Sequence, residues 1–254
     1  MQIRPGIELA ALSDVGCQRQ NNEDRYSYWE PTSEAEFAVK GRLLTVADGM
    51  GGYEGGQEAS RIAVEAVEAA YAAYTGEDVL AGLLQGFRAA HQDIQNYAVS
   101  HPALEGMGTT CTAAVLRREQ LFFVHVGDSR LYLIRGGSIS RLTQDHSYVS
   151  RLVAHGVISA EEAEFHPQRH ILTAALGAGS DVEPDTSGTG IALGAEDRLV
   201  LCTDGLWGVV REPEIMKVVV EESPEEACRQ LVEMARDRGG PDNITLQVVR
   251  VVEG

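Results

Sequence analysis

The sequence predicts one mixed α+β domain, built of two strand-rich antiparallel sheets with a pair of helices on the outer face of each sheet. Short apolar runs rich in β-branched residues recur at hairpin spacing, which indicates antiparallel strands. Between them, longer stretches carry apolar residues at helical spacing. No repeat, low-complexity stretch or linker divides the 254 residues, and a chain of this length can bury one large core. We therefore expect a single domain over residues 1–254.

The first half of the chain is expected to combine strands with one helix pair. Two stretches with helical apolar spacing are joined by Thr75-Gly76, so we expect two antiparallel helices lying on a sheet. The polar segment Pro31–Gly41 is expected to be a hairpin loop. The expected strands are Ile7–Ser13, Arg25–Trp29 and the run from Leu43, and the expected helices are Gln57–Tyr74 and Val79–Val99.

The second half begins with a predicted meander and closes with a predicted helix pair and a last strand. A short helix is expected over residues 144–154, and Ser159 and Glu162 have the spacing of a capping box for another. Ser223 is the expected N-cap of the last helix, with Pro224 in its first turn. The expected strands are Thr109–Leu116, Leu121–Val126, Arg130–Ile134, Ser138–Leu142, Ile171–Leu176, Val182–Leu193, Arg198–Thr203 and Ile244–Val252, and the expected helices are Pro213–Val220 and Pro224–Arg238.

The most informative stretch of the chain is Leu43–Gly52, with the sequence LLTVADGMGG. An apolar run typical of a buried strand ends in Asp48, and the glycines that follow let backbone approach whatever the carboxylate holds. A buried carboxylate needs a partner, because its desolvation is costly. The simplest alternative is that Asp48 caps the helix expected to begin near Gly56.

The pattern of an aspartate at one end of an apolar strand occurs twice more in the chain. The stretch Arg198–Gly205, RLVLCTDG, is an apolar strand that ends in Asp204, and Asp242 opens the last strand within GGPDNITLQVV. Carboxylate oxygens are the ligands that hard divalent cations prefer. Three aspartates at strand ends, far apart in the sequence, therefore predict one site for a hard metal ion.

Three further segments are candidates for the same site. Arg19 precedes the pair Glu23-Asp24 between two strands and offers a guanidinium fork for phosphate oxygens, although an ordinary polar loop would have the same composition. Asp128 also lies at a strand end, where the alternative is a tight turn with a surface ion pair. His166 and His170 are four residues apart, but Pro167 argues against a helical metal pair, so we favour a mobile flap that touches substrate.

Charge and composition exclude several classes of partner. The formal net charge of −17 argues against nucleic acid or an anionic membrane, since both need a basic surface. A phosphate ligand would need bound divalent cations to reverse the local sign of the site. No run approaches 18 apolar residues and no leader pattern is present, so a cytoplasmic protein is expected. The four cysteines form no C-x-x-C pair, and Cys111 and Cys202 are expected to be buried thiols rather than zinc ligands.

Six motifs in order resemble the metal-dependent serine/threonine protein phosphatases of the 2C type (the PPM family), in their bacterial form. The resemblance runs from about Ile7 to Val252. It implies a β-sandwich of two antiparallel sheets flanked by helix pairs, with a variable flap at about residues 147–170. The motifs are Arg19 with Glu23-Asp24, VADGMGG at Val46–Gly52, GMGTT at Gly106–Thr110, VGDSR at Val126–Arg130, CTDGLW at Cys202–Trp207 and GGPDNIT at Gly239–Thr245.

The resemblance also implies roles for individual residues around two Mn²⁺ or Mg²⁺ ions. Arg19 matches the phosphate-binding arginine, and Asp128 matches the residue that holds a third, weaker metal together with Asp204. His166 and His170 fall in the flap and are candidates for substrate contact. The remaining implied metal-site residues are Asp48 bridging both ions, Gly49 through its carbonyl, Asp204 and Asp242 on the first ion, and Glu23 and Asp24 on the second, mostly through water.

The implied reaction is hydrolysis of phosphoserine and phosphothreonine by in-line attack of a water or hydroxide that bridges the two ions. Two positions depart from the family pattern, because Met50 and Tyr53 stand where relatives often carry histidine. The proton for the leaving group can then come from metal-bound water, from Tyr53, or from His166 or His170, and the sequence leaves these sources open.

Two other functions compete with the enzyme. One is a catalytically inactive family member that binds phosphoproteins as a regulatory module, which loss of Asp48, Asp204 or Asp242 would have favoured. The other is a calcium-stabilised structural domain, which gives Arg19 no role. For the enzyme, the expected partners are phosphorylated proteins and a serine/threonine kinase whose marks it removes, and a free-standing monomer is expected.

Overall fold

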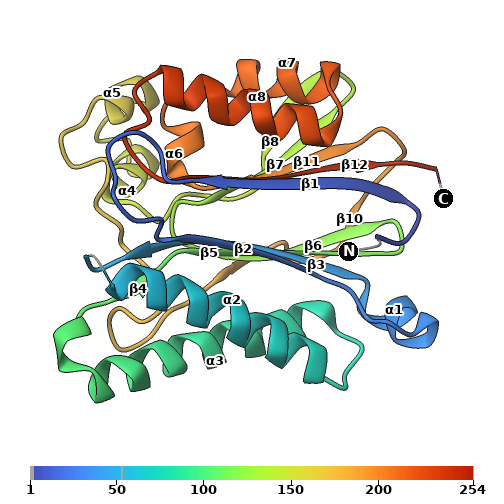
Figure 1. Ribbon diagram of the computed structural model, residues 1–254, viewed down its shortest axis with the longest axis horizontal. Coiled ribbons are helices and arrows are strands. Elements are labelled where there is room, and N and C mark those ends of the chain that lie inside the picture. Colours follow the sequence, from blue (N-terminus) through green and yellow to red (C-terminus); the bar gives the residue numbers. More distant parts are fainter. Residues whose placement is uncertain (1–2, 53, 254) are drawn as a thin grey trace.

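The computed structural model describes residues 3–52 and 54–253, and it places two antiparallel sheets face to face between two layers of helices (Figure 1). The first sheet has the strand order β1 (Ile7–Asp14), β12 (Ile244–Val251), β11 (Arg198–Cys202), β7 (Arg130–Arg135) and β8 (Ser138–Arg141). The second has the order β10 (Ile191–Ala192), β6 (Gln120–Val126), β5 (Cys111–Arg117), β3 (Arg42–Met50) and β2 (Asp24–Trp29), with β4 (Gly108–Thr109) beside β3 and β9 (Asp185–Thr186) beside β6. The predicted α+β sandwich is confirmed.

Helix pairs cover the outer faces as expected. The helices α2 (Gly55–Ala73) and α3 (Val79–Ser100) lie on the second sheet, and α7 (Glu212–Glu221) and α8 (Pro224–Asp237) lie on the first (Figure 1). Ser223 caps α8 by accepting a hydrogen bond from the amide of Glu226, which confirms the predicted cap. No helix in residues 3–52 and 54–253 is long and apolar enough to cross a membrane.

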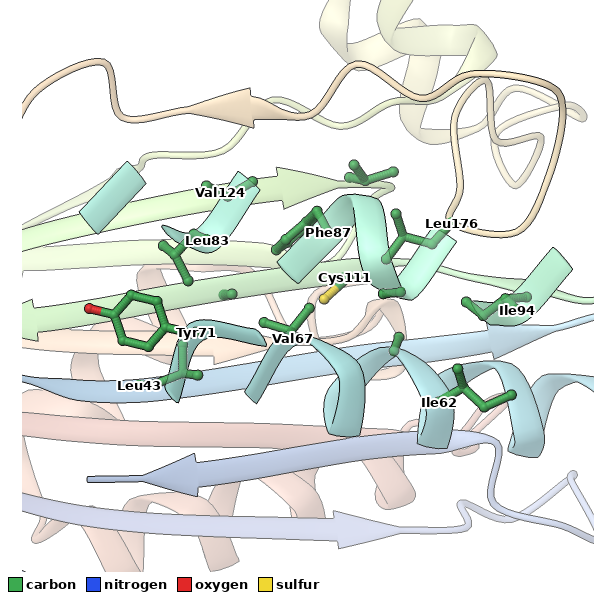
Figure 2. Close-up of a cluster of buried hydrophobic side chains, with 14 of the residues drawn as sticks. Leu43, Ile62, Val67, Tyr71, Leu83, Phe87, Ile94, Cys111, Val124 and Leu176 are labelled. Carbon is green, nitrogen blue, oxygen red and sulfur yellow. The ribbon is translucent and has the colours of Figure 1, made fainter. Parts of the chain in front are cut away.

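The alternation of side chains along the central strands divides the core into layers. In β3, Leu43 faces the cluster beneath α2 and α3, whereas Leu44 and Val46 face the cluster between the two sheets. Figure 2 shows the first cluster, in which Tyr71 and Phe87 from the helices pack over the sheet. Because both faces of β3 are covered, its sequence is a continuous apolar run rather than an alternating one.

Several sequence-based boundaries were wrong. The predicted loop Pro31–Gly41 contains the helix α1 (Glu34–Lys40), capped by Ser33. The segment Ile171–Leu176 forms only isolated bridges, to Ser147 and Thr109, because no single strand runs beside it. The predicted strand Val182–Leu193 is reduced to β9 and β10, each of two residues.

Several short helices lie at one end of the sandwich, the end opposite to α1 (Figure 1). There α4 (Tyr148–Ala154), α5 (Ala160–Glu164) and α6 (Asp204–Trp207) lie together with the loop that joins β1 to β2 (Figure 1). The 3₁₀ helix η1 (Pro102–Leu104) follows α3. The helix expected over residues 144–154 begins only at Tyr148, with Ser147 as its N-cap. The predicted capping box at Ser159 is confirmed.

Candidate active site

Two aspartates from neighbouring strands face each other at this end of the second sheet. The register of β2 and β3 pairs Asp24 directly with Asp48, which brings their Cβ atoms to about 5 Å. Asp48 does not end its strand, as its sequence context had predicted, because β4 pairs with Gly49 and Met50 and extends β3. Nor does it cap α2, whose N-cap position is Glu54. Like charges placed opposite each other on a sheet are destabilising. A cation between these two carboxylates would relieve their repulsion.

The backbone around Asp48 is fixed by the GMGTT motif. The Asp48 amide donates to Thr110 Oγ1 at 2.9 Å, and its carbonyl accepts from the Thr110 amide at 2.9 Å and from Thr109 Oγ1 at 2.8 Å. The sequence indicated this motif, but the role of its two threonines could not be predicted from it. These hydrogen bonds set the position from which the Asp48 carboxylate projects.

The first sheet contributes Asp204 to the same place. Thr203, which follows β11, donates its hydroxyl to Asp24 Oδ2 at 2.8 Å and so ties the two sheets together. Asp204 comes next and opens α6. A Cβ on Gly205 would collide with the carbonyl of Asn243, so the Asp-Gly step lets α6 pack tightly on the start of β12.

Asp242 and Arg19 form the outer rim of the site. Arg19 Nη2 donates to Asp242 Oδ2 at 2.7 Å, and the Arg19 side chain is 53% exposed. The neighbouring Asn243 holds the loop that carries Arg19. Its side-chain amide donates to the carbonyls of Val15 and Asn21, and its Oδ1 accepts from the amide of Glu23 at 2.8 Å. Asn243 is thus a positioning residue whose only sequence mark is its place in the GGPDNIT motif.

Burial close to other carboxylates raises the pKa values of these groups. Burial raises the pKa of Asp24 to about 7 and that of Asp204 to about 6. Burial, followed by the charges of neighbouring aspartates, raises the pKa values of Asp48 and Asp128 well above the ordinary range. Asp24 Oδ1 and Asp204 Oδ1 are buried without a hydrogen-bond partner. The site therefore has excess acceptor capacity and a strongly negative potential.

These residues fit a hard divalent cation. The carboxylates of the site offer only oxygen atoms as metal ligands, which suits Mg²⁺ or Mn²⁺ better than zinc. Glu23 lies in a backbone cradle, since a Cβ on Gly56 would collide with its carboxylate. As the side chains stand, no three carboxylates, histidines or cysteines of the described residues form a metal cage. Asp242 points to Arg19 and Asp24 to Thr203, so these two side chains would have to rotate to share an ion with the others.

Asp128 lies in the turn between β6 and β7 and is 7% exposed. Its carbonyl accepts from Trp207 Nε1 at 3.0 Å, and the Arg130 guanidinium lies 3.5 Å from the Trp207 ring centroid. Arg130 also forms a bidentate, buried ion pair with Asp145, at 3.0 and 2.7 Å. The ion pair considered for this motif is therefore not a surface one, and it connects the Asp128 turn to the segment that leads into the flap.

The flap histidines differ in their relation to the site. His170 Nδ1 lies 4.0 Å from Asp204 Oδ2, and burial lowers the pKa of His170. His166 instead lies near the Tyr148 ring, and its Nδ1 accepts from the amide of Gln168. Met50 lies two residues beyond Asp48 in β3, and Tyr53 falls outside the described residues.

Comparison with known proteins identifies the class to which this fold and site belong. A family model described as protein phosphatase 2C matches residues 18–245. The chain belongs to the protein phosphatase 2C family.

Similar relatives include bacterial proteins named as a serine/threonine protein phosphatase and as a protein phosphatase. The chain is 38% identical to PstP of Mycobacterium tuberculosis over 97% of its own length, and it spans 45% of that protein. It is 35% identical to PhpP of Streptococcus pneumoniae, covering 97% of the chain and 98% of PhpP.

Solved structures of related proteins are similar to this chain in fold as well as in sequence. The structure of Stp1 from Staphylococcus aureus matches with a TM-score of 0.88 at 31% identity, over 100% of this chain and 98% of that one. The catalytic domain of PstP, solved in complex with two manganese ions, matches with a TM-score of 0.83 at 37% identity, over 98% and 99%.

Proposed function

We propose that the protein is a metal-dependent phosphatase that hydrolyses phosphoserine and phosphothreonine in proteins. The observation that carries the proposal is the convergence of Asp24 and Asp48 from one sheet with Asp204 from the other. Asp24 is buried, Asp48 and Asp204 are partly buried, and all three have raised pKa values. PstP and Stp1, which are both named as serine/threonine phosphatases, support this activity, and they give no support to the alternative of an inactive binding module.

The roles proposed for the residues come from the family resemblance, and the closeness of the carboxylates supports them. Asp48, Asp204 and Asp242, with the carbonyl of Gly49, would hold two Mn²⁺ or Mg²⁺ ions, and Glu23 and Asp24 would bind through water on the side of the second. When bound, the ions supply a hydroxide at neutral pH and neutralise charge on the phosphate.

Arg19 is proposed to bind and orient the substrate phosphate. Its guanidinium is half exposed at the rim and can exchange the Asp242 carboxylate for phosphate oxygens, since the fork geometry suits both anions. Its proposed part in catalysis is therefore to fix the direction from which the phosphorus is attacked.

The finer assignments are also proposals. Asp128 would hold a third, weaker ion together with Asp204, whose charge already raises the pKa of Asp128. Of the flap histidines, His170 has the better position to contact substrate or to donate a proton, because it lies beside Asp204. The kinase partner, the monomeric state and the cytoplasmic location remain predictions.

The test is hydrolysis of a phosphothreonine peptide in the presence of EDTA, Mn²⁺, Mg²⁺ or Ca²⁺. We expect turnover with Mn²⁺ or Mg²⁺, none with EDTA, and a loss of at least about 100-fold in Asp204→Asn, because charge stabilisation by an ion contributes several kcal/mol. The control is Asp237→Asn, which removes the same charge from the surface of α8. Folded, metal-loaded protein without turnover on any phosphopeptide would overturn the proposal and favour a calcium-binding or regulatory domain.

A further inference from the structure

A pocket of about 590 Å³ lies next to the site, between α4 and the segment 172–185. Met50 forms part of its wall. Because side chains alternate along a strand, Met50 and Asp48 project from the same face of β3, about 7 Å apart. An extended peptide advances by the same distance in two residues. The pocket is therefore placed to receive a side chain about two residues from a phosphoresidue held at Asp48.

The lining of the pocket combines apolar surface with carboxylates. Met50, Leu172 and Val182 supply apolar contact, and four acidic side chains also line the wall. Two of the four are already paired, since Asp145 binds Arg130 and Arg141, and Asp185 binds His146.

The other two carboxylates, Asp181 and Glu183, are exposed and make no ion pair within the described part of the chain. The opposite wall, formed by α4, supplies one guanidinium, that of Arg151. Uncompensated negative charge thus exceeds positive charge in the pocket. A net charge of −17 on the whole chain strengthens the attraction for cations.

We propose that this pocket binds a lysine or arginine side chain of the phosphoprotein substrate, about two residues from the phosphorylated position. The inference rests on the proposed phosphatase function. A lysine or arginine has a long apolar stem and a charged head, which matches an apolar wall with carboxylates at its rim. Met50 suits such a stem, because its flexible thioether adapts to different side chains.

The experiment compares phosphothreonine peptides that carry lysine, alanine or glutamate two positions before or after the phosphothreonine. With Mn²⁺ present, we expect kcat/KM to be about three- to ten-fold higher for a lysine peptide than for the alanine peptide, as for two partly exposed ion pairs. In Asp181→Asn/Glu183→Gln the preference should disappear, and in the wild type it should weaken at high salt. Hydrolysis of p-nitrophenyl phosphate, which has no flanking residues, should be the same in both proteins.

The matched control is Glu225→Gln/Asp237→Asn on α8, which removes the same two charges away from the pocket. A preference that falls equally in this control would mean that only the overall charge matters, and would overturn the proposal. So would equal rates on all peptides, or a preference for glutamate that depends on Arg151. Failure to hydrolyse p-nitrophenyl phosphate as well would instead count against the phosphatase function itself.

Discussion

At the scale of single residues, folding brings several carboxylates close together in the site, where their ionisation is unfavourable. Asp24 and Asp128 are buried, Asp48 and Asp204 are partly buried, and all four lie close together, so each one that ionises costs free energy. Folding alone would favour uncharged side chains at these positions. A bound cation, as proposed, would offset this cost, so we infer that function rather than stability accounts for the aspartates.

Asp204→Asn is expected to stabilise the metal-free protein although it lowers activity. A folded-state pKa of about 6, above the ordinary 3.8, means that stability is full below pH 3.8 and is lost as the pH rises through 6. Asparagine has no such loss, so at pH 8 in EDTA we expect a gain on the order of 1–3 kcal/mol by urea unfolding. Asp237→Asn should leave stability unchanged. A variant less stable than the wild type at pH 8 would show that charge burial is not the main cost.

His125 should make the protein acid-sensitive. It is fully buried, accepts from Thr112 Oγ1 at Nδ1 and donates from Nε2 to the carbonyl of Gln144, and its pKa is lowered to about 4 mainly by burial. The unfolded chain takes up a proton near pH 6.5 and the folded one does not. Stability is therefore full above pH 6.5 and falls by on the order of 3 kcal/mol as the pH drops to 4.

His125→Gln should flatten this part of the stability curve, measured by urea unfolding between pH 4 and 7. His155→Gln, at an exposed position, is the control and should keep the slope of the wild type. Equal slopes in the wild type and His125→Gln would assign the acid sensitivity to other groups.

At the scale of elements, Arg130 connects three parts of the site end. It lies in β7, stacks on Trp207 of α6 and pairs with Asp145 just before the flap. Both side chains of the Arg130–Asp145 pair are mostly buried. Removing the arginine leaves a buried carboxylate with only the longer Arg141 contact at 3.3 Å.

Arg130→Met is expected to destabilise the protein by about 3 kcal/mol in urea unfolding, and Arg130→Met/Asp145→Asn should recover part of the loss. The matched surface control is Arg229→Met on α8, whose ion pair with Glu226 is exposed to solvent, so its loss should change stability much less than Arg130→Met does. A double variant as unstable as the single one would mean that Arg130 acts through stacking on Trp207 instead.

Elements with strong local patterns were predictable from the sequence, and those that depend on distant partners were not. The helices α2, α3 and α8 have long amphipathic stripes, and the capping box at Ser159 is a local motif. The segment Ile171–Leu176 has strand-like composition, but strand formation needs a neighbouring strand, which the local pattern does not reveal. The short helix α1 was missed because none of its residues is fully buried, so it has no apolar stripe to detect.

The aspartates at the ends of apolar runs, Asp48, Asp128 and Asp204, were found for a similar reason, whereas Asp24 and Asp242 precede their predicted strands and were found through their motifs. Thr203 and Asn243 were not assigned roles, because a hydroxyl or amide that braces a neighbour leaves no periodic pattern. Their only mark in the sequence is proximity to an aspartate within a recognised motif.

At the scale of the whole molecule, the site is assembled from residues between Arg19 and Asp242, so ion binding should stabilise the entire fold. An ion that binds only the folded state adds about 2.7 kcal/mol at one hundred times its dissociation constant. For a chain of this length, we expect Mn²⁺ to raise the melting temperature by about 5–10 °C for one occupied site.

The measurement is thermal unfolding in EDTA and across a Mn²⁺ titration. Asp48→Asn/Asp204→Asn should show almost no rise, whereas Asp237→Asn should match the wild type. A rise of the same size in the double variant would place the stabilising ion elsewhere.

The pairing of β1 with β12 makes a circular permutation of this domain feasible. Ile7 lies opposite Val251 in that ladder, at the end of the sandwich away from the flap, and the hairpin at Gly136-Gly137 joins β7 to β8 on the surface (Figure 1). A short linker from Val251 to Ile7 could close the chain into a ring, and new termini could be opened at the hairpin. The carboxylates would keep their places after such a circular permutation, because pairing across the sheets positions them rather than their order along the chain.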